Sequence, residues 1–118
     1  MSNIPAEIPA YVLKAQELQY SWSKGLVALR TGDPSDVGAA QKALDTLADI
    51  LKTSISLKPP AECRDLHNAL IQTLTGSMNA IISRANGENS DDLELEAQEN
   101  YSIFKVEMQR LADRYGVG

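Results

Sequence analysis

The chain has 118 residues, with 16 Asp and Glu against 11 Lys and Arg, one His, one Cys, one Trp, four Tyr and one Phe. That length fits a single domain, expected over residues 1–118, because two domains would each be too small for an adequate core. The net charge of −5 excludes the basic surface of a nucleic-acid-binding protein. A single Cys excludes a disulfide framework and a Cys-rich zinc site, and no apolar run approaches the roughly 20 residues of a membrane-spanning helix.

The first predicted element is a helix over about residues 8–30. Apolar and small residues recur at steps of four and three, so they share one helical face. This face comprises Tyr11, Ala15, Leu18, Trp22, Gly25 and Leu29. Pro9 suits a first helical turn, and Gly32 is expected as a left-handed cap after the last turn.

A second helix is predicted over about residues 34–56. Asp33 is the expected N-cap, Pro34 fits the first helical position, and Pro59 and Pro60 exclude any continuation. The predicted apolar face comprises Val37, Ala40, Leu44, Leu47, Leu51 and Ile55.

A third helix is predicted over about residues 60–86, ended by Asn86 and Gly87. Its apolar face comprises Cys63, Leu66, Leu70, Leu74, Met78, Ile81 and Ala85.

The fourth predicted helix covers about residues 91–115, with Ser90 as its N-cap. Its apolar face comprises Ala97, Tyr101, Phe104, Met108, Leu111 and Tyr115. Four amphipathic helices joined by short loops predict an all-α fold, an antiparallel up-down-up-down four-helix bundle. Gly25 and Gly76 interrupt two of these helices, either to make room for a ligand or a close helix crossing, or as tolerated imperfections.

The negative charge is concentrated near the start of the fourth helix. The acidic patch comprises Glu88, Asp91, Asp92, Glu94, Glu96 and Glu99. We expect a solvated helix N-terminus, which favours acidic side chains. The alternative, a divalent-cation site, lacks the alternating oxygens, central Gly and closing Glu of a calcium loop.

Cys63 and His67 lie four residues apart, which places them one helical turn apart on the same face. The pair could supply a nucleophile and its base, or half of a metal site. No second His or Cys exists to complete a metal site, so we expect structural packing, with His67 satisfied by one hydrogen-bond partner. Trp22 is expected in the core. Alternatively, it lines a ligand pocket near Cys63 and His67, or one that includes Tyr11, Tyr101 or Tyr115.

Catalytic and cofactor motifs are incomplete throughout. The chain lacks the Glu-x-x-His pairs of a di-iron bundle, the flanking glycines of a serine hydrolase elbow and the Gly-rich loop that holds phosphates. We therefore expect a non-enzymatic protein without a metal or cofactor.

The first helix has a second apolar stripe. Leu13, Tyr20 and Val27 repeat every seven residues and point about 180° away from Trp22 on a helical wheel. Either helix 1 is more enclosed than its neighbours, or these residues form a contact surface, most simply in a symmetric homodimer and otherwise in a groove for a partner helix.

The stretch 57–67 reads Pro-Pro, then five residues, then Leu-His at a helix opening. With Trp22 and the Gly32-Asp33 helix start, it resembles a loosely defined group of small bacterial helical-bundle domains of unknown function, often carried on lipoproteins. The resemblance spans residues 22–82. It implies a bundle and a cell-surface setting, but no activity and no functional residues.

Two functions are favoured by the sequence, and a thiol-dependent enzyme that uses Cys63 is kept as a third alternative. The first is an interaction or structural module that acts through its helix faces and self-associates. The second is a small-ligand-binding or sensor bundle with a core pocket. The N-terminus carries no secretory signal, so we expect a cytoplasmic protein, or an extracytoplasmic one if a leader was removed.

Overall fold

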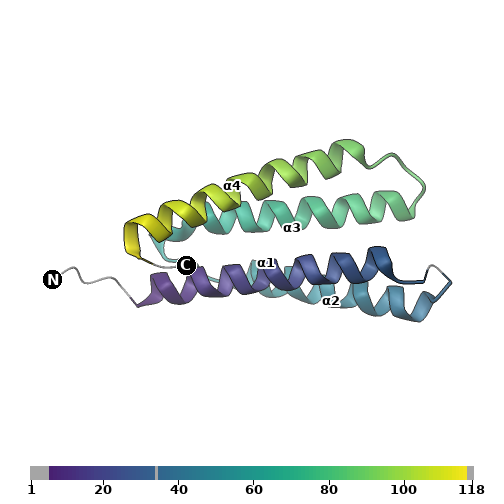
Figure 1. Cartoon of the computed structure of the whole chain (residues 1–118), viewed down its shortest axis with the longest axis horizontal. Coiled ribbons are helices and arrows are strands. Elements are labelled where there is room, and N and C mark those ends of the chain that lie inside the picture. The colour runs from purple at the N-terminus through teal and green to yellow at the C-terminus, as the bar shows by residue number, and fades with distance from the viewer. Residues whose placement is uncertain (1–5, 34, 117–118) are drawn as a thin grey trace.

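The computed structural model describes residues 6–33 and 35–116. It contains four long helices: α1 (Glu7–Thr31), α2 (Val37–Ser56), α3 (Arg64–Ala85) and α4 (Asp91–Tyr115). Successive helices run in opposite directions in an up-down-up-down order (Figure 1). The described residues contain no strand, and the predicted all-α four-helix fold is confirmed.

The start of α2 differs from the prediction. The N-cap is Asp36, whose carboxylate accepts a hydrogen bond from the backbone N–H of Ala39 at 3.0 Å. Asp33 instead accepts hydrogen bonds from the backbone N–H and the hydroxyl of Ser35. Two Asp residues three positions apart offered the same capping chemistry, and the later one caps the helix. The predicted role of Pro34 lies outside the described residues.

The ends of α1 and α3 use different geometries. Gly32 is not the expected left-handed cap, because its φ of −69° and ψ of 159° are those of extended backbone. Gly87 does adopt a left-handed φ of 75°. Its backbone N–H bonds to the carbonyl of Arg84, and that of Glu88 bonds to the carbonyl of Ser83. This pair of bonds is a Schellman motif, so Asn86 and Gly87 end α3 as predicted.

The third predicted helix begins with a different helical type. A short 3₁₀ helix, Ala61–Cys63, precedes α3, and its first carbonyl, on Pro60, accepts a bond from the backbone N–H of Cys63 at 2.9 Å. At α4, Ser90 is the N-cap residue, but its side chain makes no capping hydrogen bond. The side-chain oxygen of Asn89 accepts the backbone N–H of Asp91 instead.

The fully buried core lies mainly toward the end of the bundle where the chain begins and finishes (Figure 1). It joins the first four turns of α1, the first half of α3 and the second half of α4. Its members are Ile8, Tyr11, Val12, Ala15, Leu18, Trp22, Leu47, Cys63, Leu66, Ala69, Leu70, Leu74, Phe104 and Leu111. Helix α2 contributes only Leu47 to this core, and both ends of its predicted apolar face, Val37 and Ile55, are exposed.

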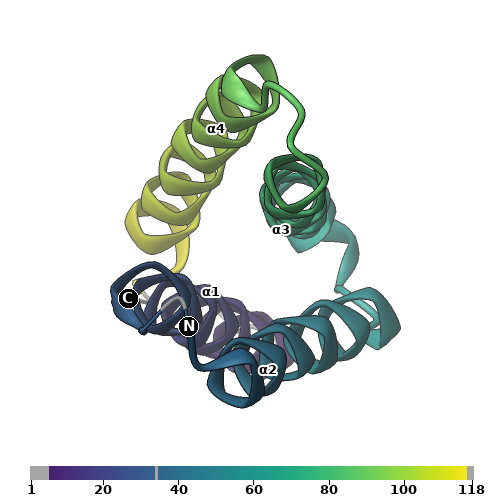
Figure 2. The same ribbon diagram turned by 90° about the vertical axis from the view of Figure 1, so that its right-hand side faces the viewer.

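The bundle consists of two hairpins, α1–α2 and α3–α4. Each helix packs most extensively on the other member of its hairpin. Viewed from the end that holds the two hairpin turns, α4 diverges from α1, and the two helices approach each other only at the far end (Figure 2). The molecule is elongated, with extents of 58 × 26 × 21 Å. The hairpins are therefore joined through the core at one end and separate at the other.

Candidate ligand-binding cleft

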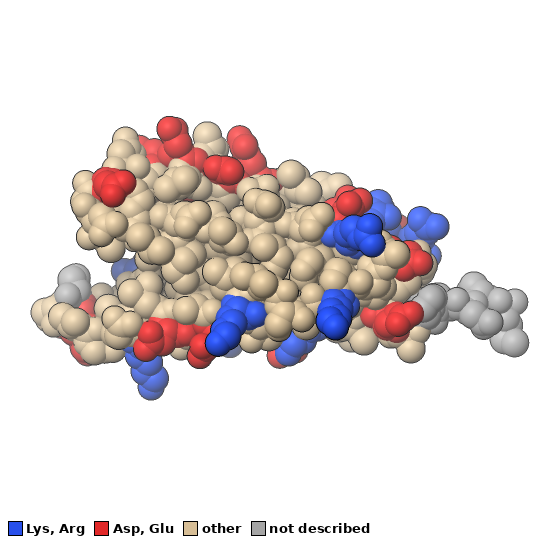
Figure 3. Space-filling model, turned by 180° about the vertical axis from the view of Figure 1, so that it is seen from behind, with Lys and Arg blue, Asp and Glu red and all other residues tan. Residues whose placement is uncertain are grey.

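A cleft of about 830 Å³ opens where the two hairpins separate. All four helices line it, and Figure 3 shows the surface hollowed between the hairpins at this end. The apolar and aromatic part of its lining comprises Trp22, Leu26, Leu29, Ala40, Leu44, Ala80, Ile81, Ala85, Ala97 and Tyr101. Volumes of about 300–1,000 Å³ with mainly apolar walls are typical of small-molecule sites.

The indole of Trp22 forms one wall of the cleft and is fixed in orientation. Its Nε1–H donates a hydrogen bond to the hydroxyl of Ser77 at 3.1 Å. Ser77 itself lines the cleft beside Thr73, and the Thr73 hydroxyl is satisfied by the backbone carbonyl of Ala69. Because an indole N–H needs a partner when the ring is buried, Ser77 allows Trp22 to be buried at the cleft wall.

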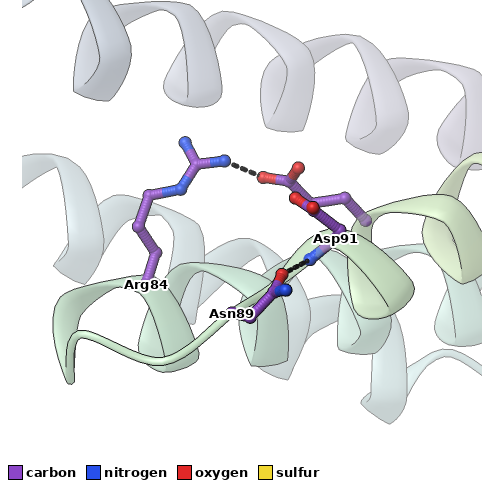
Figure 4. A network of polar contacts seen from close by, with 4 residues as sticks. Arg84, Asn89 and Asp91 are labelled. Atoms are coloured by element: carbon purple, nitrogen blue, oxygen red, sulfur yellow. Dashed lines mark hydrogen bonds and ion pairs between the residues drawn. The ribbon is translucent and has the colours of Figure 1, made fainter.

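The charged side chains of the lining lie toward the hairpin turns. They are Arg30 near the end of α1, Arg84 near the end of α3 and Glu94 near the start of α4. Arg84 reaches across the α3–α4 turn and pairs with the carboxylate of Glu94 (Figure 4). In the described part of the chain Arg30 makes no ion pair. The mouth of the cleft is therefore charged, whereas its interior is uncharged and largely aliphatic and aromatic, with polar side chains such as Gln19, Ser23 and Thr73 among them.

A second cluster of chemically distinctive residues lies at the opposite end of the bundle. The hydroxyl of Tyr11 and Nδ1 of His67 share a hydrogen bond of 2.5 Å, and Cys63 is buried at the same end. Burial lowers the pKa of His67. It also raises the pKa of Tyr11, with a smaller contribution from Cys63. Both shifts favour a pair in which the phenol and the imidazole are neutral.

The thiol of Cys63 is poorly suited to nucleophilic chemistry. Burial is the main cause that raises its pKa, the neighbouring carboxylate of Glu62 raises it further, and Arg110 opposes both. The thiolate, and not the thiol, is the nucleophile and the metal ligand. At neutral pH this arrangement therefore stabilises a packed, protonated Cys63.

The structure does not bring the residues of the predicted ligand pocket together. Trp22 lines the cleft, whereas Cys63 and His67 do not; of the tyrosines, Tyr101 lines it and Tyr11 does not. The role of Ser77 was not predicted from the sequence. The available signal was its place on the apolar face of α3, because a polar residue on such a face indicates a polar partner.

The second stripe of α1 is exposed. The exposed fractions are 57% for Leu13, 61% for Tyr20 and 59% for Val27, so enclosure of α1 does not explain their apolar character. Lys24 lies over the ring of Tyr20, with 4.9 Å between Nζ and the ring centroid. Leu95, Ile103 and Val106 form a similar exposed set on α4.

Acidic residues gather along α4, at the upper edge of the face in Figure 3. Across residues 6–33 and 35–116, no three His, Cys, Asp or Glu side chains converge closely enough to hold a metal ion. None of the helices in this part of the chain combines the length and the hydropathy needed to cross a bilayer.

No protein family, no curated protein and no solved structure matches this chain. The comparisons therefore assign no relative, and arguments about function rest on the cleft and on the exposed helix faces.

Proposed function

We propose that this chain is a non-enzymatic binding module that holds a small, largely apolar ligand in the cleft between its two hairpins. The observation that carries this proposal is the cleft itself: about 830 Å³, lined by all four helices, with the indole of Trp22 held in place by Ser77. Apolar walls with a few well-placed polar groups are what small-molecule sites use for affinity and orientation.

The titratable groups support a non-catalytic role. His67 is paired with Tyr11 away from the cleft, and the raised pKa of Cys63 keeps its thiol protonated. The charged side chains of the cleft, Arg30, Arg84 and Glu94, are suited to orienting a ligand. Arginine does not exchange protons at neutral pH, so it does not act as a general acid or base there.

A titration with decan-1-ol that is monitored by the fluorescence of Trp22 tests this proposal. Since Trp22 is the sole tryptophan, a change in its emission reports on the cleft wall. We expect saturable binding in the micromolar range, together with a rise in melting temperature, because a ligand that binds only the native state stabilises it.

A filled cleft provides the matched control. Ala40→Phe places a ring at the mouth and should abolish binding, whereas Ala48→Phe, on the exposed face of the same helix, should leave it unchanged. If decan-1-ol leaves the emission and melting temperature of the wild type unchanged, or if both variants bind it equally, the cleft is not the binding site.

Self-association through α1 is a second candidate function, favoured by the exposure of Leu13, Tyr20 and Val27. In an antiparallel pair of α1 helices crossing near Tyr20, Leu13 of one copy would face Val27 of the other. The same symmetry would bring Glu17 close to Lys24 of the second copy, so the charges at the seam are self-complementary.

A further inference from the structure

The lining of the cleft changes character along the bundle axis. From Gln19 to Arg30, α1 lines about 16 Å of it at a rise of 1.5 Å per residue. Trp22 and Tyr101 lie toward the core, and Arg30 and Arg84 lie toward the hairpin turns. The cleft is therefore elongated, with its charged side chains at the mouth. Its interior is uncharged and combines apolar walls with the polar side chains of Gln19, Ser23, Thr73, Ser77 and Gln98.

The charge of the mouth is opposite to that of the whole molecule. Two arginines and one glutamate line the cleft, which gives it a net charge of +1 in a chain of net charge −5. Arg84 and Glu94 pair with each other, so the guanidinium of Arg30 accounts for the remaining positive charge.

Helix dipoles do not offset this charge. The C-termini of α1 and α3 and the N-termini of α2 and α4 all lie at the end with the hairpin turns (Figure 1). Their partial charges are of opposite sign and similar size, so the side chains decide which charge the mouth prefers.

We propose that the ligand is a free single-chain amphiphile with an anionic head, a fatty carboxylate, whose chain lies along Trp22 and whose carboxylate is bound by Arg30 at the mouth. This inference rests on the proposed function. A guanidinium matches a carboxylate with two parallel hydrogen bonds, and the apolar walls of α1, α3 and α4 match an extended hydrocarbon chain.

Three probes with the same ten-carbon chain test the preference for a charged head: decanoate, decan-1-ol and decyltrimethylammonium, each titrated against the full chain at pH 7.5 with Trp22 fluorescence as the readout. Without a cation at the mouth, the neutral alcohol would bind more tightly than decanoate, because the carboxylate loses more hydration on entry. With Arg30 in place we expect decanoate to bind about tenfold more tightly than the alcohol, and the cationic amphiphile to bind most weakly.

Variants of Arg30 test the position of the head group. Arg30→Gln should raise the Kd of decanoate by about five- to tenfold and leave the Kd of decan-1-ol within about twofold, while Arg30→Lys should restore part of the loss. Arg64→Gln makes the same charge change on an exposed residue outside the cleft and should leave both Kd values unchanged. Circular dichroism checks that each variant is folded.

The outcomes separate the two proposals. If decan-1-ol binds but decanoate binds no more tightly, or if Arg30→Gln and Arg64→Gln behave alike, the anionic ligand is wrong and the apolar binding function stands. If decyltrimethylammonium binds best, the acidic residues at the start of α4 determine the charge preference of the mouth, and the inference is overturned. If none of the three probes binds, both the inference and the proposed function are wrong.

Discussion

His67, the sole histidine, illustrates how burial can decide the charge of a residue. Burial lowers the pKa of its imidazole, and Nδ1 shares a hydrogen bond with the hydroxyl of Tyr11. The pair links α1 to α3, in surroundings that favour a neutral imidazole.

This state predicts a pH-dependent stability. Above about pH 6.5 the imidazole is neutral in the folded and the unfolded chain, so the pKa shift contributes nothing. Below that pH the unfolded chain takes up the proton more readily than the folded chain, and the free energy of unfolding decreases. Urea denaturation at pH 7.5 and pH 5.5 should show a larger loss for the wild type than for His67→Gln, which keeps a side-chain acceptor but does not titrate. Equal losses would mean that His67 is not the group responsible.

Two glycines within helices differ in how closely the neighbouring helix approaches them. A Cβ on Gly25 would lie 2.6 Å from Cδ2 of Leu47, whereas a Cβ on Gly76 would lie 3.5 Å from Cβ of Ala97. The first distance requires a buried side chain to move, and the second is an ordinary contact. Gly25 therefore permits the close approach of α1 and α2, and Gly76 is not required for the packing of α3 on α4.

The same substitution at these two positions should change stability in opposite directions. Gly76→Ala should raise the free energy of unfolding by about 0.5–1 kcal/mol, the usual gain from replacing a mid-helix glycine. Gly25→Ala should lower it by about 1–2 kcal/mol, because crowding of Leu47 outweighs that gain. Chemical denaturation of both variants beside the wild type measures the difference, and stabilisation by Gly25→Ala would show that Leu47 adapts without strain.

At the scale of the whole molecule, the separation of the hairpins and the exposed stripe on α1 offer two distinct surfaces. The cleft lies between the α1–α2 and α3–α4 hairpins, whereas Leu13, Tyr20 and Val27 are exposed on another face of α1. Ligand binding and self-association through α1 can therefore be tested independently.

Tyr20→Glu tests self-association. In an antiparallel pair that crosses near Tyr20, the two introduced carboxylates would meet at the crossing point and repel each other, and the apolar contact of the ring would be lost. Light scattering should therefore show a shift toward monomer while circular dichroism stays unchanged. Ile103→Glu makes a comparable change at an exposed apolar residue on α4 and should not alter the oligomeric state. A wild type that is monomeric at high protein concentration would contradict this candidate function.

The local features of the fold could be predicted from the sequence. Helical periodicity, two adjacent prolines and Asn86-Gly87 act within one or two turns of the chain, so the four helices and most of their ends could be located. Where two neighbouring residues have the same local chemistry, the sequence does not tell which of them takes the role. Asp33 and Asp36 offer the same capping chemistry, and only the folded chain shows that the carboxylate of Asp36 accepts the bond from the backbone N–H of Ala39.

The candidate site depends on contacts that the sequence could not provide. Trp22 and Ser77 are 55 positions apart, and the cleft exists because α4 approaches α1 at one end only. Helical periodicity determines which face of a helix is buried, but it contains no information on how far that face lies from its neighbour. The sequence by itself thus determined the helices, most of the residues on their buried faces and the suspected role of Trp22. The tertiary structure alone decided that Trp22 faces a cleft with Arg30 at its mouth, while Cys63 is buried in the core at the other end and His67 is half-buried beside Tyr11.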